Sequence, residues 1–126
     1  IDHFKNFNDT YGHQVGDFVL VSIADCLRNS LRPTDLTARY GGEEFTVILP
    51  QTSGENAMIA AERVRESVSS LNLVTPGGLE LPPLTISIGV SELTASESME
   101  QLIEAADRAL YTAKESGRNR VHNATV

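Results

Sequence analysis

Three segments of the chain carry apolar residues at the i, i+3, i+4 spacing of an amphipathic helix. The first runs from about Val15 to Ser30 and ends before Pro33, because a proline disfavours helical backbone in the residue before it. The second begins after Ser53, which can cap it, and the third begins at Ser98–Gln101, which fits a capping box. Gly117 suits the position just past the end of the third helix. The predicted inward-facing residues are Phe18, Val19, Ile23, Ala24, Leu27 and Leu31 for the first helix, Ala57, Ala60, Ala61, Val64 and Val68 for the second, and Leu102, Ile103, Ala106, Ala109, Leu110 and Ala113 for the third.

The segments between these helices have the pattern of β-strands. Thr37–Tyr40 and Phe45–Leu49 flank Gly41-Gly42 and predict a hairpin, whose second strand ends at Pro50. Leu84–Val90 alternates apolar residues with Thr and Ser, which predicts a strand with one buried face. Weaker signals predict a strand that enters at Ile1, a short hairpin of residues 73–74 with 79–81, and an edge strand over residues 120–122. This order predicts an α+β fold in which helices pack around a mostly antiparallel central sheet.

Composition and charge exclude several classes of protein. The chain has 126 residues, 40% hydrophobic and 21% charged, as expected for one soluble globular domain. Its 10 Lys and Arg against 17 Asp and Glu give a net charge of −7, so it lacks the basic surface that general nucleic-acid or anionic-membrane binding needs. No transmembrane run or signal peptide is visible, which favours a cytoplasmic location. The single Cys26 excludes an internal disulfide and a cysteine-cluster zinc site, and it is interpreted as a half-buried structural thiol.

The hairpin turn Gly41-Gly42-Glu43-Glu44 is the most informative local feature. The glycines let the backbone turn tightly and let a ligand approach it closely. The two carboxylates at the tip suit a hard divalent cation such as Mg²⁺. A solvated acidic turn is the alternative, but Glu is a poor turn residue, which favours a functional role.

A polar segment punctuated by Gly12 and Gly16 precedes the first helix. It contains Asn8, Asp9, His13 and Asp17, whose side chains can pair with the edge of a base or with a hydroxyl. Turn formation and helix-start electrostatics explain the same residues equally well. The three histidines, His3, His13 and His122, have no metal-ligand spacing, so none is predicted to bind zinc.

The lysines lie near the two ends of the chain, at Lys5 and Lys114. Lys114 is four residues before Arg118, so both cations can point the same way near the end of the third helix. They can complement the helix dipole or hold a triphosphate. No phosphate-binding P-loop is present, and no serine or cysteine has an evident base partner.

Several of these motifs together resemble the GGDEF domain of bacterial diguanylate cyclases, in order and along the whole chain. The matching segments are residues 1–17, Arg39-Tyr-Gly-Gly-Glu-Glu-Phe45, Thr85-Ile-Ser-Ile-Gly-Val90, Ala106-Asp-Arg-Ala-Leu-Tyr111 with Lys114, and Gly117-Arg-Asn119. The resemblance implies a palm-like fold related to nucleotidyl cyclases and polymerases. It also implies the condensation of two GTP into cyclic di-GMP with release of pyrophosphate, at the interface of two domains that meet as an isologous homodimer.

The resemblance also implies roles for individual residues. Glu43 would bind Mg²⁺ (or Mn²⁺) together with the backbone carbonyl of Ile1, and either Glu43 or Glu44 would be the catalytic base. Arg32, Asp35 and Arg63 would form a product-inhibition site. The expected substrate-binding residues are Asn8 and Asp17 as readers of guanine with His13 beside them, Lys114 and Arg118 at the terminal phosphates, Phe4 and Lys5 along the phosphate pocket, and Gly41 and Gly42 at the turn.

Residues 1–126 are expected to form one such domain that is incomplete at its N-terminus. In the family an Asp precedes the position of Ile1 and binds the metal, and most of the first strand lies before it. Two other functions compete with the enzyme. A non-catalytic receptor for GTP or cyclic di-GMP is disfavoured because Glu43 and Glu44 are present, and an adenylyl-type cyclase is disfavoured because Asn8 and Asp17 match a guanine reader.

Overall fold

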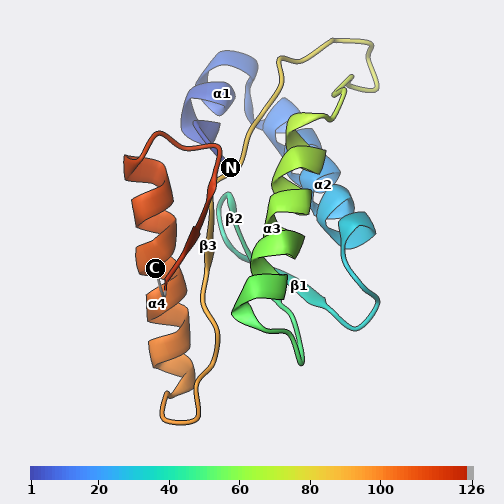
Figure 1. Cartoon of the computed structure of the whole chain (residues 1–126). Helices are drawn as coiled ribbons and strands as arrows, with labels where there is room; N and C mark the ends of the chain where they lie inside the picture. The colour runs from blue at the N-terminus through green and yellow to red at the C-terminus, as the bar shows by residue number, and fades with distance from the viewer. Residues whose placement is uncertain (125–126) are drawn as a thin grey trace.

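The computed structural model describes residues 1–124. Its elements are α1 (Phe4–Tyr11), α2 (His13–Ser30), β1 (Leu36–Gly41), β2 (Glu44–Ile48), α3 (Gly54–Ser69), β3 (Ile88–Val90), α4 (Met99–Glu115) and β4 (Val121–Asn123). Figure 1 shows α4 on one side of the strands, with α2 and α3 on the other. None of the helices in this part of the chain is both long and apolar enough to cross a membrane. The α+β class predicted from the sequence is confirmed.

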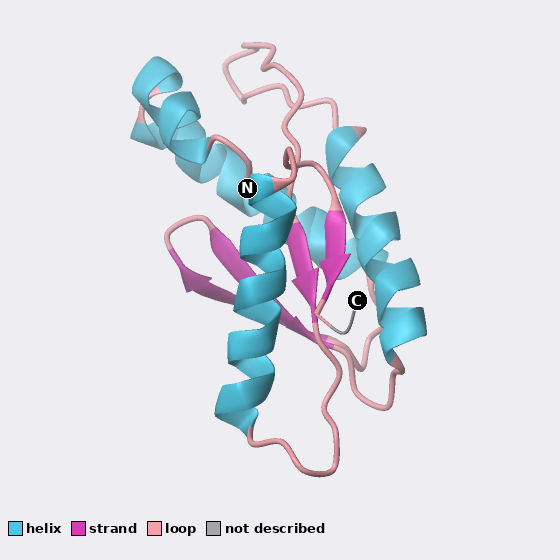
Figure 2. Cartoon of the chain, turned by 60° about the vertical axis from the view of Figure 1, so that its left-hand side comes forward, coloured by secondary structure: helices cyan, strands magenta, loops and turns pink. Residues whose placement is uncertain are grey.

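The described strands form two separate pairs. β1 and β2 make the predicted antiparallel hairpin (Figure 2). In its register Leu36 faces Ile48 and Arg39 faces Phe45. β3 and β4 pair in parallel, with Gly89 opposite His122. The prediction of a last strand after the third helix is correct, and this strand is the parallel member of a sheet that was predicted to be mostly antiparallel. Helix α4 carries the chain back along the sheet between the two strands, and such a crossover makes them parallel.

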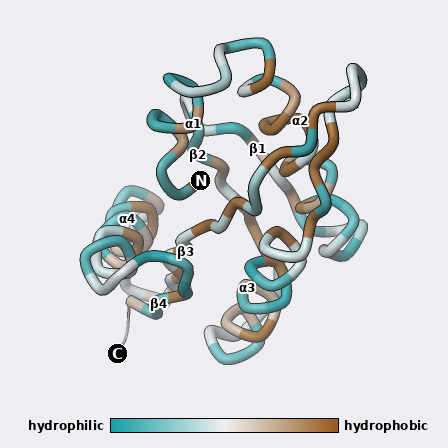
Figure 3. The backbone as a smooth tube through the Cα atoms, turned by 90° about the horizontal axis from the view of Figure 1, so that it is seen from above, coloured by the Kyte–Doolittle hydropathy of each residue, from teal (hydrophilic) through white to brown (hydrophobic). Residues whose placement is uncertain are grey.

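The hydrophobic core lies between the helices and the strands. The β3–β4 pair contacts α4 and α3, and Figure 3 shows it between these helices from above. Val19, Ile23 and Val68 are the largest fully buried side chains, so the inward faces predicted for the first two helices are confirmed at these positions. Cys26 is half-buried against the same core, as predicted. Leu84, Ile86 and Val90 are buried, which confirms the predicted buried face of that segment, but only Ile88–Val90 forms a strand, so the predicted strand was too long at its start.

The start of the chain differs from the sequence prediction. Instead of a strand followed by a polar loop, residues 4–11 form α1, and α2 begins at His13. Phe4, Phe7 and Tyr11 follow one helical face, with ring centroids 6.3 Å apart for the first pair and 4.7 Å for the second. The polar residues between these rings obscured the helical period. Gly12, with φ of 86°, separates the two helices, and Asp17 lies in the second turn of α2 rather than in its first.

The predicted helix ends are confirmed. The Ser53 hydroxyl accepts a hydrogen bond from the Asn56 backbone at 3.2 Å. Ser98 and Gln101 form both bonds of the capping box at the start of α4. Gly117 directly follows Ser116, the C-cap residue of α4, and has φ of 119°, which only glycine adopts readily.

Gly89 in β3 allows the close packing of strand and helix. A Cβ atom at this position would lie 2.2 Å from the Ala106 carbonyl oxygen and 2.3 Å from the Leu110 nitrogen. Both are main-chain atoms of α4, which no side-chain rotation can move away. The sheet therefore approaches α4 as closely as it does because residue 89 has no side chain.

We expect Gly89→Ala to destabilise the protein by about 3 kcal/mol, because α4 must shift to admit the methyl group. Gly77→Ala is the matched control, since its added Cβ would meet nothing closer than the Thr75 hydroxyl at 3.9 Å. That variant should stay within about 0.5 kcal/mol of the parent protein. Urea and thermal unfolding of both variants measure the difference, and equal midpoints would contradict this account of β3–α4 packing.

Candidate active site

A cleft of about 220 Å³ lies where the start of the chain, the β1–β2 turn and the end of α4 meet. Its lining residues are Ile1, His3, Phe4, Lys5, Asn6, Glu43, Lys114 and Arg118. They come from positions more than 100 residues apart in the sequence, so only the fold brings them together. The cleft collects the residues that the sequence analysis assigned to the metal and to the phosphates.

The β1–β2 turn presents its two carboxylates differently. Gly42 has φ of 44°, and the Arg39 guanidinium donates to the Gly42 carbonyl at 2.8 Å, which holds the turn closed. Glu43 is half-buried and lines the cleft, whereas Glu44 is exposed and does not. The backbone nitrogen of Ile1 lies 3.4 Å from the Glu43 carbonyl oxygen, so the first residue sits directly beside the turn.

Three cations line the cleft: Lys5, Lys114 and Arg118. They include both lysines of the sequence, and within residues 1–124 none of the three forms an ion pair. Unpaired cations that converge on one cleft favour a multiply charged anion. This site lies in a chain whose net charge is −7, so the positive character of the cleft is local.

The setting of Arg118 differs from the prediction. The sequence placed Lys114 and Arg118 one turn apart on a helix, but α4 ends at Glu115 and Arg118 follows in the left-handed region with φ of 63°. The Arg118 amide donates to the Ala113 carbonyl at 3.0 Å and the Gly117 amide to that of Lys114 at 3.3 Å. These are the two bonds of a Schellman motif, and they turn the chain back toward the cleft.

Asp2 was missed by the sequence analysis. Its side chain is buried, with 4% of the residue exposed, and its carboxylate accepts from the Ser87 hydroxyl at 2.6 Å, the Thr85 hydroxyl at 2.8 Å and the Asn119 amide at 3.0 Å. Burial acts to raise the pKa of Asp2, but these hydrogen bonds outweigh it and hold the pKa below the ordinary value. The signal was available, since Thr85 and Ser87 place two hydroxyls on one face of an otherwise apolar strand.

The residues expected to read guanine lie outside the cleft lining, on α1 and α2. Asp17 and His13 are exposed on α2, and Asn8 lies on α1. The Asn8 side-chain oxygen is buried, and among residues 1–124 it is the one buried side-chain polar atom without a hydrogen-bond partner. It packs against Gly16, whose missing Cβ would lie 1.8 Å away. An acceptor without a protein donor is a group that a ligand can satisfy.

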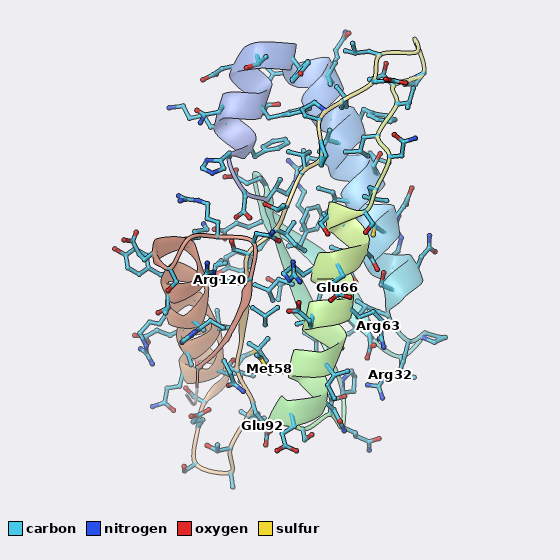
Figure 4. All side chains as sticks on the ribbon, turned by 45° about the horizontal axis from the view of Figure 1, so that its top comes forward. Arg32, Met58, Arg63, Glu66, Glu92 and Arg120 are labelled. Atoms are coloured by element: carbon cyan, nitrogen blue, oxygen red, sulfur yellow. The ribbon has the colours of Figure 1, made fainter. Side chains whose placement is uncertain are left out.

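A second cavity, of about 260 Å³, lies between the ends of α2, β2 and α3 and contains Arg32, Asp35 and Arg63. It shares no lining residue with the cleft. The Arg32 guanidinium donates to the Asp35 carboxylate at 3.0 Å and to the Thr52 hydroxyl at 2.7 Å. The hydrogen bond between Arg32 and Asp35 holds the pKa of Asp35 below its usual value. Arg63 donates to the Ser30 carbonyl at 3.2 Å, and Figure 4 shows it on the same side of the molecule as Arg32.

The protein atoms of the cleft can supply only some of the ligands that a hard divalent cation needs. Glu43 and Ile1 both line the cleft, and a Glu side chain and a backbone carbonyl each offer an oxygen donor. Within the described residues no group of three or more His, Cys, Asp or Glu side chains could hold a metal ion. Mg²⁺ commonly binds one or two carboxylates together with water and substrate phosphates, which the neighbouring cations can hold. The residues present fit Mg²⁺ in that form.

Comparisons with known proteins identify the family of this chain. The family profile described as "Diguanylate cyclase, GGDEF domain" matches residues 1–120. "Diguanylate cyclase A" of Treponema denticola is 49% identical over 122 residues, which cover 96% of this chain and 32% of that protein. The chain therefore spans about a third of that curated relative's length.

Two solved structures are also similar. The crystal structure of the GGDEF domain of DgcB from Caulobacter crescentus, in complex with c-di-GMP, superposes with a TM-score of 0.94 at 42% identity, over 100% of this chain and 74% of that one. The active GGEEF domain of a diguanylate cyclase from Vibrio cholerae has a TM-score of 0.88 at 31% identity, over 98% and 78% of the two chains. Because the profile covers nearly the whole chain and agrees with the fold, this chain belongs to the GGDEF-domain family of diguanylate cyclases.

Proposed function

We propose that this chain is the catalytic domain of a diguanylate cyclase, which joins two GTP into cyclic di-GMP and releases pyrophosphate. The observation that carries the proposal is the convergence of the half-buried Glu43 with three unpaired cations in one cleft. The Vibrio relative, an active GGEEF domain, supports the Glu-containing form of the turn that is present here. A cytoplasmic output domain of a larger sensor protein is the setting that we infer for it.

In the proposed reaction the chain mainly positions and neutralises GTP. Lys114 and Arg118 bind the terminal phosphates, and the backbone at Phe4 and Lys5 lines their path. Glu43 and the Ile1 carbonyl would hold Mg²⁺, which would supply positive charge against the charge that develops on the phosphate. The 3′-hydroxyl of the other GTP forms a bond to the α-phosphorus while the bond to the pyrophosphate leaving group breaks. The exposed Glu44 carboxylate, beside the cleft and outside its lining, is the group that we assign to accept the hydroxyl proton.

Catalysis by this route needs two domains. Each cleft holds one GTP, and the product has two-fold symmetry, so two copies must face one another with their turns inward. The glycines of the turn leave open space around the backbone, with no atom within 4 Å of an added Cβ at Gly41 or Gly42. We therefore propose a homodimer of domains as the active form.

The second cavity favours a further role for cyclic di-GMP, as an inhibitor. Its arginines can grip the two phosphates of the product, and Asp35 can accept from a guanine edge. A domain that kept only this cavity would be a non-catalytic receptor. The presence of Glu43 in the separate cleft favours the enzyme with feedback inhibition.

In a complete domain we expect Glu43→Ala and Glu44→Ala each to lower the rate of cyclic di-GMP synthesis by roughly 100-fold or more, because the first removes the carboxylate that would hold Mg²⁺ and the second removes the proposed proton acceptor. Stability should change little, since neither carboxylate is in the core. Glu80→Ala, another exposed acidic residue, serves as the control. Chromatographic quantification of product tests this, and near-normal turnover in both variants would exclude the assignment.

We expect Gly16→Ala and Asp17→Ala to weaken the preference for GTP over ATP by about tenfold, which corresponds to about 1.4 kcal/mol. The methyl group of the first variant must displace the Asn8 side chain, while alanine suits the helix better than glycine. Competition between the two nucleotides gives the preference, and unfolding gives stability. An unchanged preference in both variants would place the base reader elsewhere.

We expect Arg32→Ala to relieve inhibition by cyclic di-GMP while the KM for GTP changes less than about twofold, because the cavity and the cleft share no residue. Arg28→Ala is the matched control, since Arg28 is an exposed arginine on α2 outside the cavity. Product-inhibition titrations of the three proteins test this. Superimposable curves would show that the bonds of Arg32 are structural only.

A further inference from the structure

The turn that follows α4 has an unfavourable backbone. Arg118 and Asn119 are consecutive non-glycine residues in the left-handed region, with φ of 63° and 49°, directly after Gly117. Asparagine tolerates this conformation better than most residues, but arginine does not. Such a turn persists only when its surroundings hold it in place. Because Arg118 lines the cleft, the contacts that hold this turn also fix where the Arg118 side chain starts.

Two contacts hold Asn119 from outside the turn, in addition to the Schellman bonds of the helix end. The Asn119 backbone amide donates to the Asp2 carboxylate at 3.0 Å. The Asn119 side-chain oxygen accepts from the Arg65 guanidinium at 2.8 Å. One contact fixes the main chain and the other fixes the side chain, so residue 119 is held at two points.

Both outside partners are themselves fixed. Asp2 is buried, it accepts from the hydroxyls of Thr85 and Ser87, and its own amide donates to the Thr85 carbonyl at 2.9 Å. The Arg65 side chain is only 17% exposed, and its guanidinium also donates to Glu62 on the same helix, at 2.9 Å from its Nε. The turn is therefore tied to the strand segment on one side and to α3 on the other.

We propose that Asp2, Arg65 and Asn119 are positioning residues that hold Arg118 in the cleft for the terminal phosphates of the substrate. This proposal rests on the proposed function, in which Arg118 binds those phosphates. None of the three lines the cleft, so they act on substrate through Arg118. Asp2 is also the neighbour of Ile1 in the chain. Its buried carboxylate therefore sets the distance between Ile1 and Arg118, which both line the cleft.

The contact of Arg65 with Asn119 can be removed without burying a charge. Asn119→Gly deletes the acceptor, relaxes the left-handed backbone and keeps the amide that donates to Asp2. Asn119→Asp keeps an acceptor oxygen for Arg65 and is the conservative rescue. Arg65→Met removes the donor and keeps most of the aliphatic stem. Arg108→Met is the matched control, because Arg108 pairs with Glu104 on the exposed face of α4.

The test is a double-mutant cycle on GTP binding, measured by calorimetry in the presence of Mg²⁺, with cyclic di-GMP synthesis recorded in parallel. We expect Asn119→Gly and Arg65→Met to weaken GTP binding about fivefold to tenfold, and to leave guanosine binding unchanged. Asn119→Asp and Arg108→Met should resemble the parent protein. In an Arg118→Ala background the first two substitutions should have no further effect, because the group that they position is gone.

Three results would overturn the proposal: unchanged GTP binding in Asn119→Gly and Arg65→Met, the same loss in both backgrounds, or no weakening by Arg118→Ala itself. The two readouts separate this proposal from the proposed function. A complete domain that binds GTP but makes no cyclic di-GMP would contradict the enzyme assignment, and the cycle would still decide whether these residues position Arg118.

Discussion

The buried carboxylate of Asp2 is the interaction around which the cleft is organised. A carboxylate is removed from water at a high cost unless donors surround it, and here one amide and two hydroxyls do so. These donors belong to segments more than 80 residues further along the chain. Satisfying one local requirement therefore brings the first residues, several of which line the cleft, against residues 85–87 and against the turn after α4, which carries Arg118.

The same arrangement explains how an acidic chain can offer a site for a triphosphate. The net charge of −7 is spread over the surface, where most acidic side chains are exposed or paired with arginine. Lys5, Lys114 and Arg118 instead converge without an acidic partner among the described residues. Charge at short range decides binding, because the field of more distant surface charges is screened within about 10 Å. Composition excluded a nucleic-acid surface but was no guide to this cleft.

The sequence predicted the elements that depend on neighbouring residues, and it missed features that depend on contacts between residues far apart in the chain. The three long helices, their caps and the Gly41-Gly42 hairpin were predictable, because each depends on residues within a few positions of one another. Helix α1 was missed because polar residues separate its buried rings, and the parallel pairing of β4 depends on the path of α4. The role of Asp2 was missed for the same reason as the parallel pairing of β4, because both depend on distant parts of the chain. A buried carboxylate shows its role only through partners that the sequence places far away.

Helix α3 connects the two halves of the proposed chemistry. Arg63 donates to the Ser30 carbonyl and lines the second cavity, whereas Arg65 donates to Asn119 beside the cleft. Residues two apart on a helix project about 200° apart around its axis, so one helix serves both faces. The two cavities share no lining residue, yet a rigid shift of α3 changes the contacts of Arg63 and Arg65 together. Under the proposed function, a ligand at Arg63 would contact α3 directly and a substrate at Arg118 would act on α3 through Asn119 and Arg65, without competing for the same space.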